Sequence, residues 1–190
     1  MRSHTDTLEF IRRGRETKRY HTHPMLDNQR VDAHSFGVAM MTWALVPVAS
    51  PERRSRLLMA ALVHDLAEHH TGDIPAPAKR KLGLREQFGG YEDALLQEHA
   101  MFVDLDAADA RVLKLADCAD GALHCIRDYT MGNKYAAEPF HNFVRYLIEE
   151  QGLGEIGRAV EAGEQTVRRY IEQQWTAANP KYRAEEGYVY

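Results

Sequence analysis

The sequence predicts one compact all-α domain, and three observations support this fold class. Apolar residues recur at helical spacing along most of the chain, and no run alternates apolar and polar residues as a half-buried strand does. Capping residues, prolines and glycines divide the chain into segments of ordinary helix length. No internal repeat or long linker splits the 190 residues, so we expect a single helical domain over 1–178 and a polar C-terminal tail at 179–190.

Start and stop signals divide the first half of the chain into three helices. Thr5 or Asp6 caps the first, which ends near Gly14, and an irregular segment follows at 20–31. The second begins at an Asp32 cap, and we expect its apolar stripe to face the core: Phe36, Met40 and Trp43, with Ala39. The third starts at Ser50-Pro51-Glu52, because proline costs no hydrogen bond at the first helical position, and it ends at Gly72.

Prolines also mark the boundary to the second half. Pro75 and Pro77 predict a turn at 74–79, because each disfavours helical geometry in the residue before it. Further helices are expected at about 91–103, 107–129, 139–150 and 155–177. Cys118 and Cys125 lie seven residues apart within one of these helices, which excludes a CxxC redox pair and a disulfide framework.

Composition excludes several classes of partner. The chain is 44% hydrophobic and 27% charged, as in ordinary globular proteins, and its net charge of −4 argues against a broad nucleic-acid interface. No apolar stretch approaches the roughly 20 residues that cross a bilayer, and the N-terminus lacks the apolar centre of a secretory signal. We expect a cytoplasmic protein whose partners include no nucleic acid and no membrane. Ten histidines, against six phenylalanines, indicate a metal or acid–base site.

The segment from His64 to Asp73 concentrates residues with chemical function. His64 and Asp65 are adjacent on a predicted helix, and Glu68 lies one turn later on the same face. An ion held by the first two residues would therefore have a carboxylate beside it that can take a proton from water. Asp73 follows the glycine that ends the helix and can fold back over the same point. The zinc-protease pattern HExxH is absent.

His64 and Asp65 cannot fill the coordination sphere of a metal alone. His34 lies in the first turn of its predicted helix, and Asp117 lies on or near an apolar helix face, where a carboxylate is costly to bury without a partner. Two histidines and two aspartates suit zinc, manganese, cobalt, nickel or iron. The alternative for Asp117 is a surface ion pair with Arg111 or Lys114.

The spacing H…HD…D resembles that of the HD-domain metal-dependent phosphohydrolases, which implies a compact helical HD-domain bundle. The segment HDLAEHHTGDIPAPAK is similar to the small deoxynucleotide 5′-phosphatases of bacteria, whose core motif is HD-x-x-E-x-x-T-G-D-x-P-x-P-x-K. The resemblance extends from about residue 19 to residue 129. Every fixed position of the motif is present: His64, Asp65, Glu68, Thr71, Gly72, Asp73, Pro75, Pro77 and Lys79.

The segment before the first histidine resembles a narrower branch of the family. Arg19-Tyr20 stands where the bacterial phosphatases have Arg-Trp, and the RYHTHPM and DAHSFG segments are closer to the compact phage triphosphohydrolases that remove dATP. This resemblance implies that Arg19, Lys79 and Lys114 contact phosphates, and that Tyr20 packs on the deoxyribose. Plain surface positions are the alternative for the two lysines.

The resemblance implies a metal-dependent hydrolase of deoxynucleotides. His34, His64, Asp65 and Asp117 would hold zinc, cobalt or manganese, and Glu68, assisted by Asp73, would orient or deprotonate the water. We expect a dATP triphosphohydrolase that releases deoxynucleoside and triphosphate. The alternatives are a deoxyribonucleoside 5′-monophosphatase and a nucleotide-sensing HD module without turnover.

The family also implies a homo-oligomer, a dimer or a hexamer, in the cytoplasm, which is the host cytoplasm for a phage protein. Four histidines close to the motifs carry two interpretations, a contact in the pocket or an ordinary surface or helix-end position: His21, His23, His69 and His70. Asp120, one turn after Asp117, either supports a metal ligand or faces solvent.

Overall fold

The computed structural model describes residues 2–46, 49–149 and 169–178. Within these ranges the protein is helical, and its only strand-like feature is an isolated bridge between Lys18 and Arg30. This confirms the all-α prediction. The named elements are α1 His4–Gly14, α2 Val31–Leu45, α3 Pro51–Val63, α4 Glu68–Thr71, α5 Ala76–Lys81, α6 Arg85–Glu98, α7 Ala107–Thr130, the 3₁₀ helix η1 Lys134–Ala136 and α8 Ala137–Glu149.

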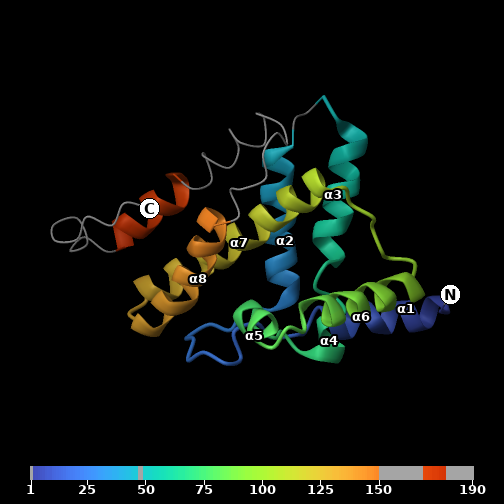
Figure 1. The fold of residues 1–190 in the computed structure, drawn as a ribbon, viewed down its shortest axis with the longest axis horizontal. Helices are drawn as coiled ribbons and strands as arrows, with labels where there is room; N and C mark the ends of the chain where they lie inside the picture. Colours follow the sequence, from blue (N-terminus) through green and yellow to red (C-terminus); the bar gives the residue numbers. More distant parts are fainter. Residues whose placement is uncertain (1, 47–48, 150–168, 179–190) are drawn as a thin grey trace.

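The long helix α7 organises the molecule. It packs against α2, which lies between α7 and α3, and α8 folds back along its C-terminal half (Figure 1). The short helices α4 and α5 gather with α1 and α6 at one end of this arrangement (Figure 1). No helix in the described ranges is both long and apolar enough to span a membrane.

The main core forms around α7. Val112, Leu115 and Ala119 of this helix are buried, and the free thiols of Cys118 and Cys125 are buried as well. Phe140 of α8 stacks on Trp175 with ring centroids 4.0 Å apart, which docks the helical residues 169–178 onto this core. The rest of the helix predicted at 155–177 and the predicted tail at 179–190 lie outside the described residues.

A second core cluster fixes the turn that follows α3. Phe10 of α1 packs with Leu66 and Ala67 of the turn and with Leu95 and Leu96 of α6. Helix α1 can approach because it ends in glycine: a Cβ atom on Gly14 would lie 2.6 Å from the carbonyl oxygen of Leu66. This end of the molecule is therefore built to hold one short turn in place.

The predicted apolar stripe of α2 does not face the core. Phe36, Met40 and Trp43 are 63%, 50% and 44% exposed, and of the predicted stripe only Ala39 is buried. The buried face carries smaller residues instead: His34, Ser35, Val38, Ala39 and Thr42. Small side chains allow α3 and α7 to approach α2 closely on that side, so the larger residues point outward.

The other differences from the predicted elements concern helix ends. Ser3, rather than Thr5 or Asp6, caps α1, and its reciprocal bonds with Asp6 form a capping box. Helix α2 begins at Val31 without a side-chain cap, because the residue before it, Arg30, has no side-chain acceptor; Asp32 lies within the first turn and pairs with Arg30.

Two predictions in the middle of the chain were also wrong. The turn predicted at 74–79 is shorter than expected, because Pro77 occupies the first turn of α5 without losing a helical hydrogen bond. Helix α6 occupies Arg85–Glu98 rather than 91–103. Gly83 has a left-handed backbone, and the helix begins two residues later, after Leu84.

Candidate metal and nucleotide site

The helix predicted to run unbroken from residue 51 to Gly72 is interrupted at His64. The backbone N–H of Leu66 donates to Val63 O at 3.0 Å and that of Glu68 to Asp65 O at 3.1 Å, so bonds over three residues replace the α-helical pattern. Short segments of this tighter geometry within helices often mark functional positions. The turn leaves Leu66 and Ala67 in the core and presents His64 and Asp65 on its other side.

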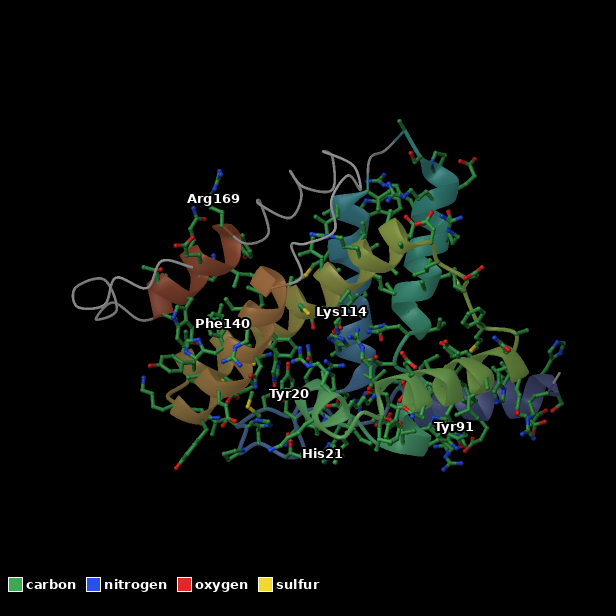
Figure 2. The ribbon with its side chains drawn as sticks, in the orientation of Figure 1. Tyr20, His21, Tyr91, Lys114, Phe140 and Arg169 are labelled. Carbon is green, nitrogen blue, oxygen red and sulfur yellow. The ribbon has the colours of Figure 1, made fainter. Side chains whose placement is uncertain are left out.

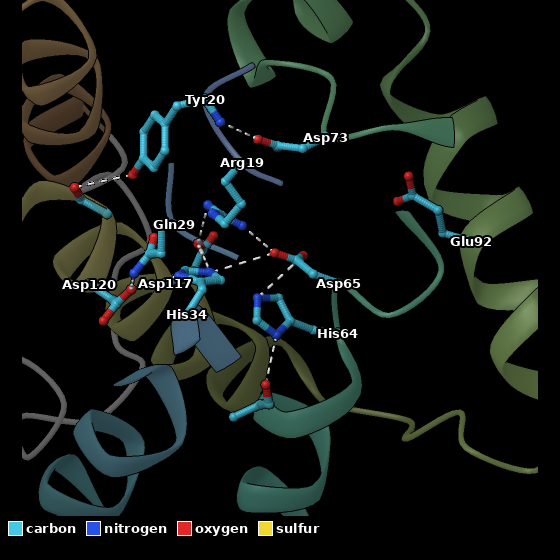
Figure 3. Close-up of polar contacts among 12 residues, drawn as sticks. Arg19, Tyr20, Gln29, His34, His64, Asp65, Asp73, Glu92, Asp117 and Asp120 are labelled. Atoms are coloured by element: carbon cyan, nitrogen blue, oxygen red, sulfur yellow. Dashed lines mark hydrogen bonds and ion pairs between the residues drawn. The ribbon is translucent and has the colours of Figure 1, made fainter. Parts of the chain in front are cut away.

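Four predicted metal ligands from three elements meet at this turn. Ligand atoms of His34 on α2 and of His64 and Asp65 in the turn lie within 4.8 Å of one another. Asp117 on α7 joins them, with its Oδ1 3.2 Å from His34 Nε2 (Figure 3). The structure therefore brings together two imidazoles and two carboxylates from sequence positions up to 83 apart, from 34 to 117.

The rings of both histidines are oriented for ligation. The Nδ1 of His64 lies 2.8 Å from Ala61 O, and because a carbonyl only accepts, this nitrogen donates. The Nδ1 of His34 lies 2.7 Å from Asp120 Oδ2. Both Nε2 atoms are buried and face the carboxylates of Asp65 and Asp117, and neither forms a hydrogen bond with any residue that the structure describes. A histidine that donates from one nitrogen to a carbonyl or carboxylate, with the other free, is the usual arrangement of a metal ligand, so a divalent metal fits this site.

Asp120 is itself fixed by its surroundings. Gln29 Nε2 donates to its Oδ2 at 2.8 Å. A Cβ atom on Gly37 would lie 2.0 Å from its Oδ1, so only glycine leaves room for the carboxylate between α2 and α7. Of the two interpretations that the sequence left for Asp120, the structure shows the contact with His34.

The guanidinium of Arg19 lies among the predicted ligands. It is buried, donates to Asp65, and has its Nη2 3.8 Å from Asp117 Oδ1. The next residue, Tyr20, has a left-handed backbone with φ of 59°, and its N–H donates to Asp73 Oδ2 at 3.0 Å (Figure 3). Asp73 therefore holds the backbone corner that directs Arg19 toward the acidic groups.

The segment after Tyr20 is anchored by a buried carboxylate on α7. Asp128 accepts hydrogen bonds from the backbone N–H groups of Leu26 and Asp27, each at 3.1 Å, and from the Asn133 side chain. The same Asn133 amide donates to Pro24 O at 2.7 Å. The irregular segment predicted at 20–31 is thus tied to the end of α7.

Glu68 differs electrostatically from the predicted ligands. It is only 7% exposed, and its Oε2 is buried without a hydrogen-bond partner. Burial raises the pKa of Glu68 well above its usual value, and the nearby carboxylates of Asp65 and Asp73 raise it further. Glu68 is therefore the carboxyl group of the site that is disposed to hold a proton.

Asp117 is held in the opposite state. Burial raises its pKa, but Lys114, His34 and Arg19 outweigh burial and hold the pKa of Asp117 well below its usual value. The site thus combines a carboxylate of lowered pKa with a carboxyl group whose raised pKa makes it a stronger proton acceptor, a combination used for acid–base chemistry.

The site opens into a cavity of about 530 Å³. Its floor includes Arg19, Tyr20, Asp65, Glu68 and Asp117. One side, the α8 wall, consists of Glu138, Pro139, Asn142 and Phe143. The opposite side, the α5–α6 wall, includes Lys79, Arg80, Arg85, Gly89 and Glu92.

The predicted substrate residues line this cavity. Tyr20 is 7% exposed; its ring stacks on His124 at 5.1 Å between centroids, and its hydroxyl donates to Gly121 O at 3.3 Å. Lys79 forms an ion pair with Glu92 at 3.2 Å, and Lys114 forms one with Asp117. Figure 2 shows Lys114 and Tyr20 toward the middle of the molecule and His21 at its edge.

The structure distinguishes between the two interpretations of the four histidines close to the motifs. His23 lines the cavity, whereas His21 is exposed and does not. His69 and His70 lie against the ring of Phe10, with centroid distances of 4.9 Å and 6.3 Å, and neither lines the cavity. These two histidines pack α4 against α1.

Sequence reasoning missed several residues of the site. His124, Gln29, Arg80 and Arg85 gave no signal, because none belongs to the spaced motif and their proximity depends on tertiary packing. For Asp120 the signal existed, since its position one turn after Asp117 placed it on the same helix face.

Comparison with known proteins identifies the fold. A family model described as HD domain matches residues 11–95. This match confirms the resemblance found in the sequence, and the matched region includes three of the four predicted ligands: His34, His64 and Asp65.

Named enzymes are similar to this chain in sequence. The 5′-deoxynucleotidase of Citrobacter koseri is 27% identical over 58% of this chain and 67% of its own length. The 5′-deoxynucleotidase YfbR of Salmonella paratyphi B is 26% identical over the same shares.

Solved structures share the fold. The HD phosphohydrolase DatZ of cyanophage S-2L, bound to dA and one catalytic Zn²⁺ ion, matches with a TM-score of 0.63 at 20% identity, covering 91% of this chain and 98% of DatZ. The PH0347 protein of Pyrococcus horikoshii OT3 matches with a TM-score of 0.65 at 22% identity, covering 87% and 98% of the two chains.

Proposed function

We propose that this protein is a metal-dependent phosphohydrolase of deoxynucleotides, and that its principal substrate is a deoxynucleoside triphosphate such as dATP. The observation that carries the proposal is the pair of buried, unbonded Nε2 atoms on His34 and His64, which lie beside Asp65 at the floor of a cavity. The deoxynucleotidase names of the relatives and the dA bound to DatZ support the substrate class.

The proposed metal ligands are His34, His64, Asp65 and Asp117, and the metal is zinc, cobalt or manganese. When bound, the metal draws charge from the phosphoryl oxygens and makes water more acidic. Asp120 keeps the ring of His34 in the orientation that ligation requires.

Glu68 is the proposed base. It takes a proton from the attacking water, whose oxygen bonds to the α-phosphorus while the bond from phosphorus to O5′ breaks. The leaving O5′ takes up a proton, so that one water is consumed and a deoxynucleoside and triphosphate are released. Asp73 assists by fixing the backbone of Tyr20, and Arg19, Lys79 and Lys114 offset phosphate charge.

Tyr20 is the proposed sugar-contacting residue. Its ring is fixed between His124 and Phe143, with centroid distances of 5.1 Å and 6.3 Å, so it presents a rigid surface to the cavity. A 2′-hydroxyl group pressed against this ring would lose its hydrogen bonds with water, which disfavours ribonucleotides.

The test is incubation with dATP, ATP or dAMP and zinc, cobalt or manganese, with products resolved by chromatography. We expect deoxyadenosine and triphosphate from dATP, and little turnover of ATP. Glu68→Gln and Asp65→Asn should lower turnover about a hundredfold or more, whereas Glu86→Gln, which changes an exposed carboxylate on α6, should not lower it. Unchanged activity in the first two variants would refute the mechanism.

A second candidate function is a 5′-monophosphatase, which the 5′-deoxynucleotidase relatives favour. Deoxyadenosine and monophosphate from dAMP, without turnover of dATP, would establish it. Tight nucleotide binding without turnover at any metal would instead indicate a nucleotide-sensing module. We further propose a homo-oligomer, a dimer or a hexamer, in the cytoplasm; sedimentation velocity measures the assembly directly.

A further inference from the structure

The two walls of the cavity differ in charge. The α5–α6 wall carries three cationic side chains, Lys79, Arg80 and Arg85, against the single carboxylate of Glu92. The α8 wall carries one charged residue, Glu138, beside proline, asparagine and phenylalanine. An elongated ligand with an anionic end therefore fits the cavity in one direction only.

The cations of the cavity also differ in how far they are already neutralised. Arg19 contacts Asp65, Lys114 contacts Asp117, and Lys79 contacts Glu92. The side chains of Arg80 and Arg85, by contrast, form no ion pair or hydrogen bond with any residue that the structure describes. Their charge remains available to a ligand.

The local backbone explains why both arginines reach the cavity. Arg80 lies in the last turn of α5 and Arg85 begins α6, and Gly83 between them has a φ of 67°, which reverses the chain direction within a few residues. One turn after Arg85, Gly89 lines the cavity, and a Cβ atom there would contact nothing within 4 Å. The wall beside Arg85 is therefore open.

The position of Tyr20 fixes the direction of the nucleoside. Its ring meets Phe143 of the α8 wall edge-on at 6.3 Å, and Figure 3 shows it on the opposite side of Asp65 from Glu92 of the α5–α6 wall. With the sugar against Tyr20 and the α-phosphate at the predicted ligands, the base extends along the α8 wall. Any further phosphates then extend toward the α5–α6 wall.

We propose that Arg80 and Arg85 form a subsite for the terminal phosphates of a nucleoside triphosphate. This inference rests on the proposed function and selects the triphosphate over the monophosphate as the substrate of the site. A monophosphate ends at the metal site, where Arg19 and Lys114 are close, and gains nothing from the two arginines. A triphosphate adds charge where guanidinium groups can bind it with paired hydrogen bonds.

The test measures Arg80→Gln, Arg85→Gln and the variant that carries both substitutions. The control is Lys81→Gln, which changes an exposed cation of α5 that does not line the cavity. We expect the double variant to lower kcat/KM for dATP at least tenfold, through KM, and to change kcat/KM for dAMP less than twofold. The Lys81→Gln variant should match the wild type on both substrates. An equal loss on both substrates, or no loss on dATP, would overturn the subsite.

Binding of inorganic tripolyphosphate, measured by titration calorimetry, separates this inference from the proposed function. The wild type and Lys81→Gln should bind it, and the double variant at least tenfold more weakly. Turnover of dAMP alone, without tripolyphosphate binding, would overturn the subsite and leave a deoxynucleotide phosphohydrolase. Turnover of neither nucleotide would refute the proposed function, and the calorimetry would then decide the subsite by itself.

Discussion

Replacing Asp128 with alanine removes the buried carboxylate that anchors the segment after Tyr20. Asp128 is 0% exposed and accepts from the N–H groups of Leu26 and Asp27 and from the amide of Asn133. The substitution leaves three donors without their acceptor, and they differ in access to water. Leu26 and Asp27 are exposed, whereas Asn133 is 7% exposed.

The expected loss of stability follows from this difference. A hydrogen bond to a charged group contributes about 1.5–3 kcal/mol, and less where water can replace the lost acceptor. About 1 kcal/mol for each exposed backbone donor and about 2 kcal/mol for the buried amide give roughly 4 kcal/mol for Asp128→Ala. For a chain of this size, that corresponds to a fall in Tm of about 8–16 °C. Asp128→Asn keeps one acceptor oxygen but places a second amide NH₂ group next to that of Asn133. We therefore expect this variant to lose about 2 kcal/mol in the free energy of unfolding.

Urea unfolding followed by circular dichroism measures both variants. Asp27→Asn is the matched control, because this carboxylate lies on the same segment and forms only an exposed ion pair with Arg127 at 3.4 Å. It should change the free energy of unfolding by less than about 0.5 kcal/mol. If Asp128→Ala were as stable as this control, the assignment of the carboxylate as an anchor would be wrong.

Three further predictions concern the site and the core. Asp120→Asn removes the charged partner of His34 and should weaken zinc binding about 10–100-fold in competition with a chelator; unchanged affinity would contradict the role of this contact. Glu68→Gln should lower kcat for dATP about 10²–10⁴-fold with KM nearly constant, and a loss confined to KM would exclude Glu68 as the base. Burial raises the pKa of Cys125 to about 12, so almost no thiolate exists at pH 8, and iodoacetamide should label this residue only after denaturation. Mass spectrometry checks this, and rapid labelling of the native protein would show that the thiol is accessible.

The proximity of His64, Asp65 and Glu68 could be expected from the sequence because it depends on short spacings. His64, Asp65 and Glu68 lie within one turn of each other under helical or 3₁₀ geometry, so the break at His64 changed the local hydrogen bonds without separating them. Apolar spacing could not reveal that break, since periods of 3.0 and 3.6 residues differ little over four positions.

The face of α2 that is buried could not be predicted from the sequence. Its apolar residues occupy more than one face, and the pattern marks a face as apolar without identifying what packs against it. The small residues Val38 and Ala39 face Ala61 and Ala116, whereas Phe36 and Trp43 point outward. The roles of Arg80 and Arg85 could not be predicted either, because an arginine near a helix end is ordinarily a surface residue, and only the tertiary structure shows that these two line a cavity.

The close contact between Gly37 and Asp120 constrains how this protein can diverge. Even an alanine at position 37 would collide with the Asp120 carboxylate and force it to shift from its place beside the imidazole of His34, so position 37 is constrained although Gly37 is not one of the predicted metal ligands. Homologous sequences that keep this chemistry should therefore pair the first histidine with a glycine three residues later and the final aspartate with an acid three residues later. Related domains that lack either this glycine or this acid are candidates for domains without catalytic activity.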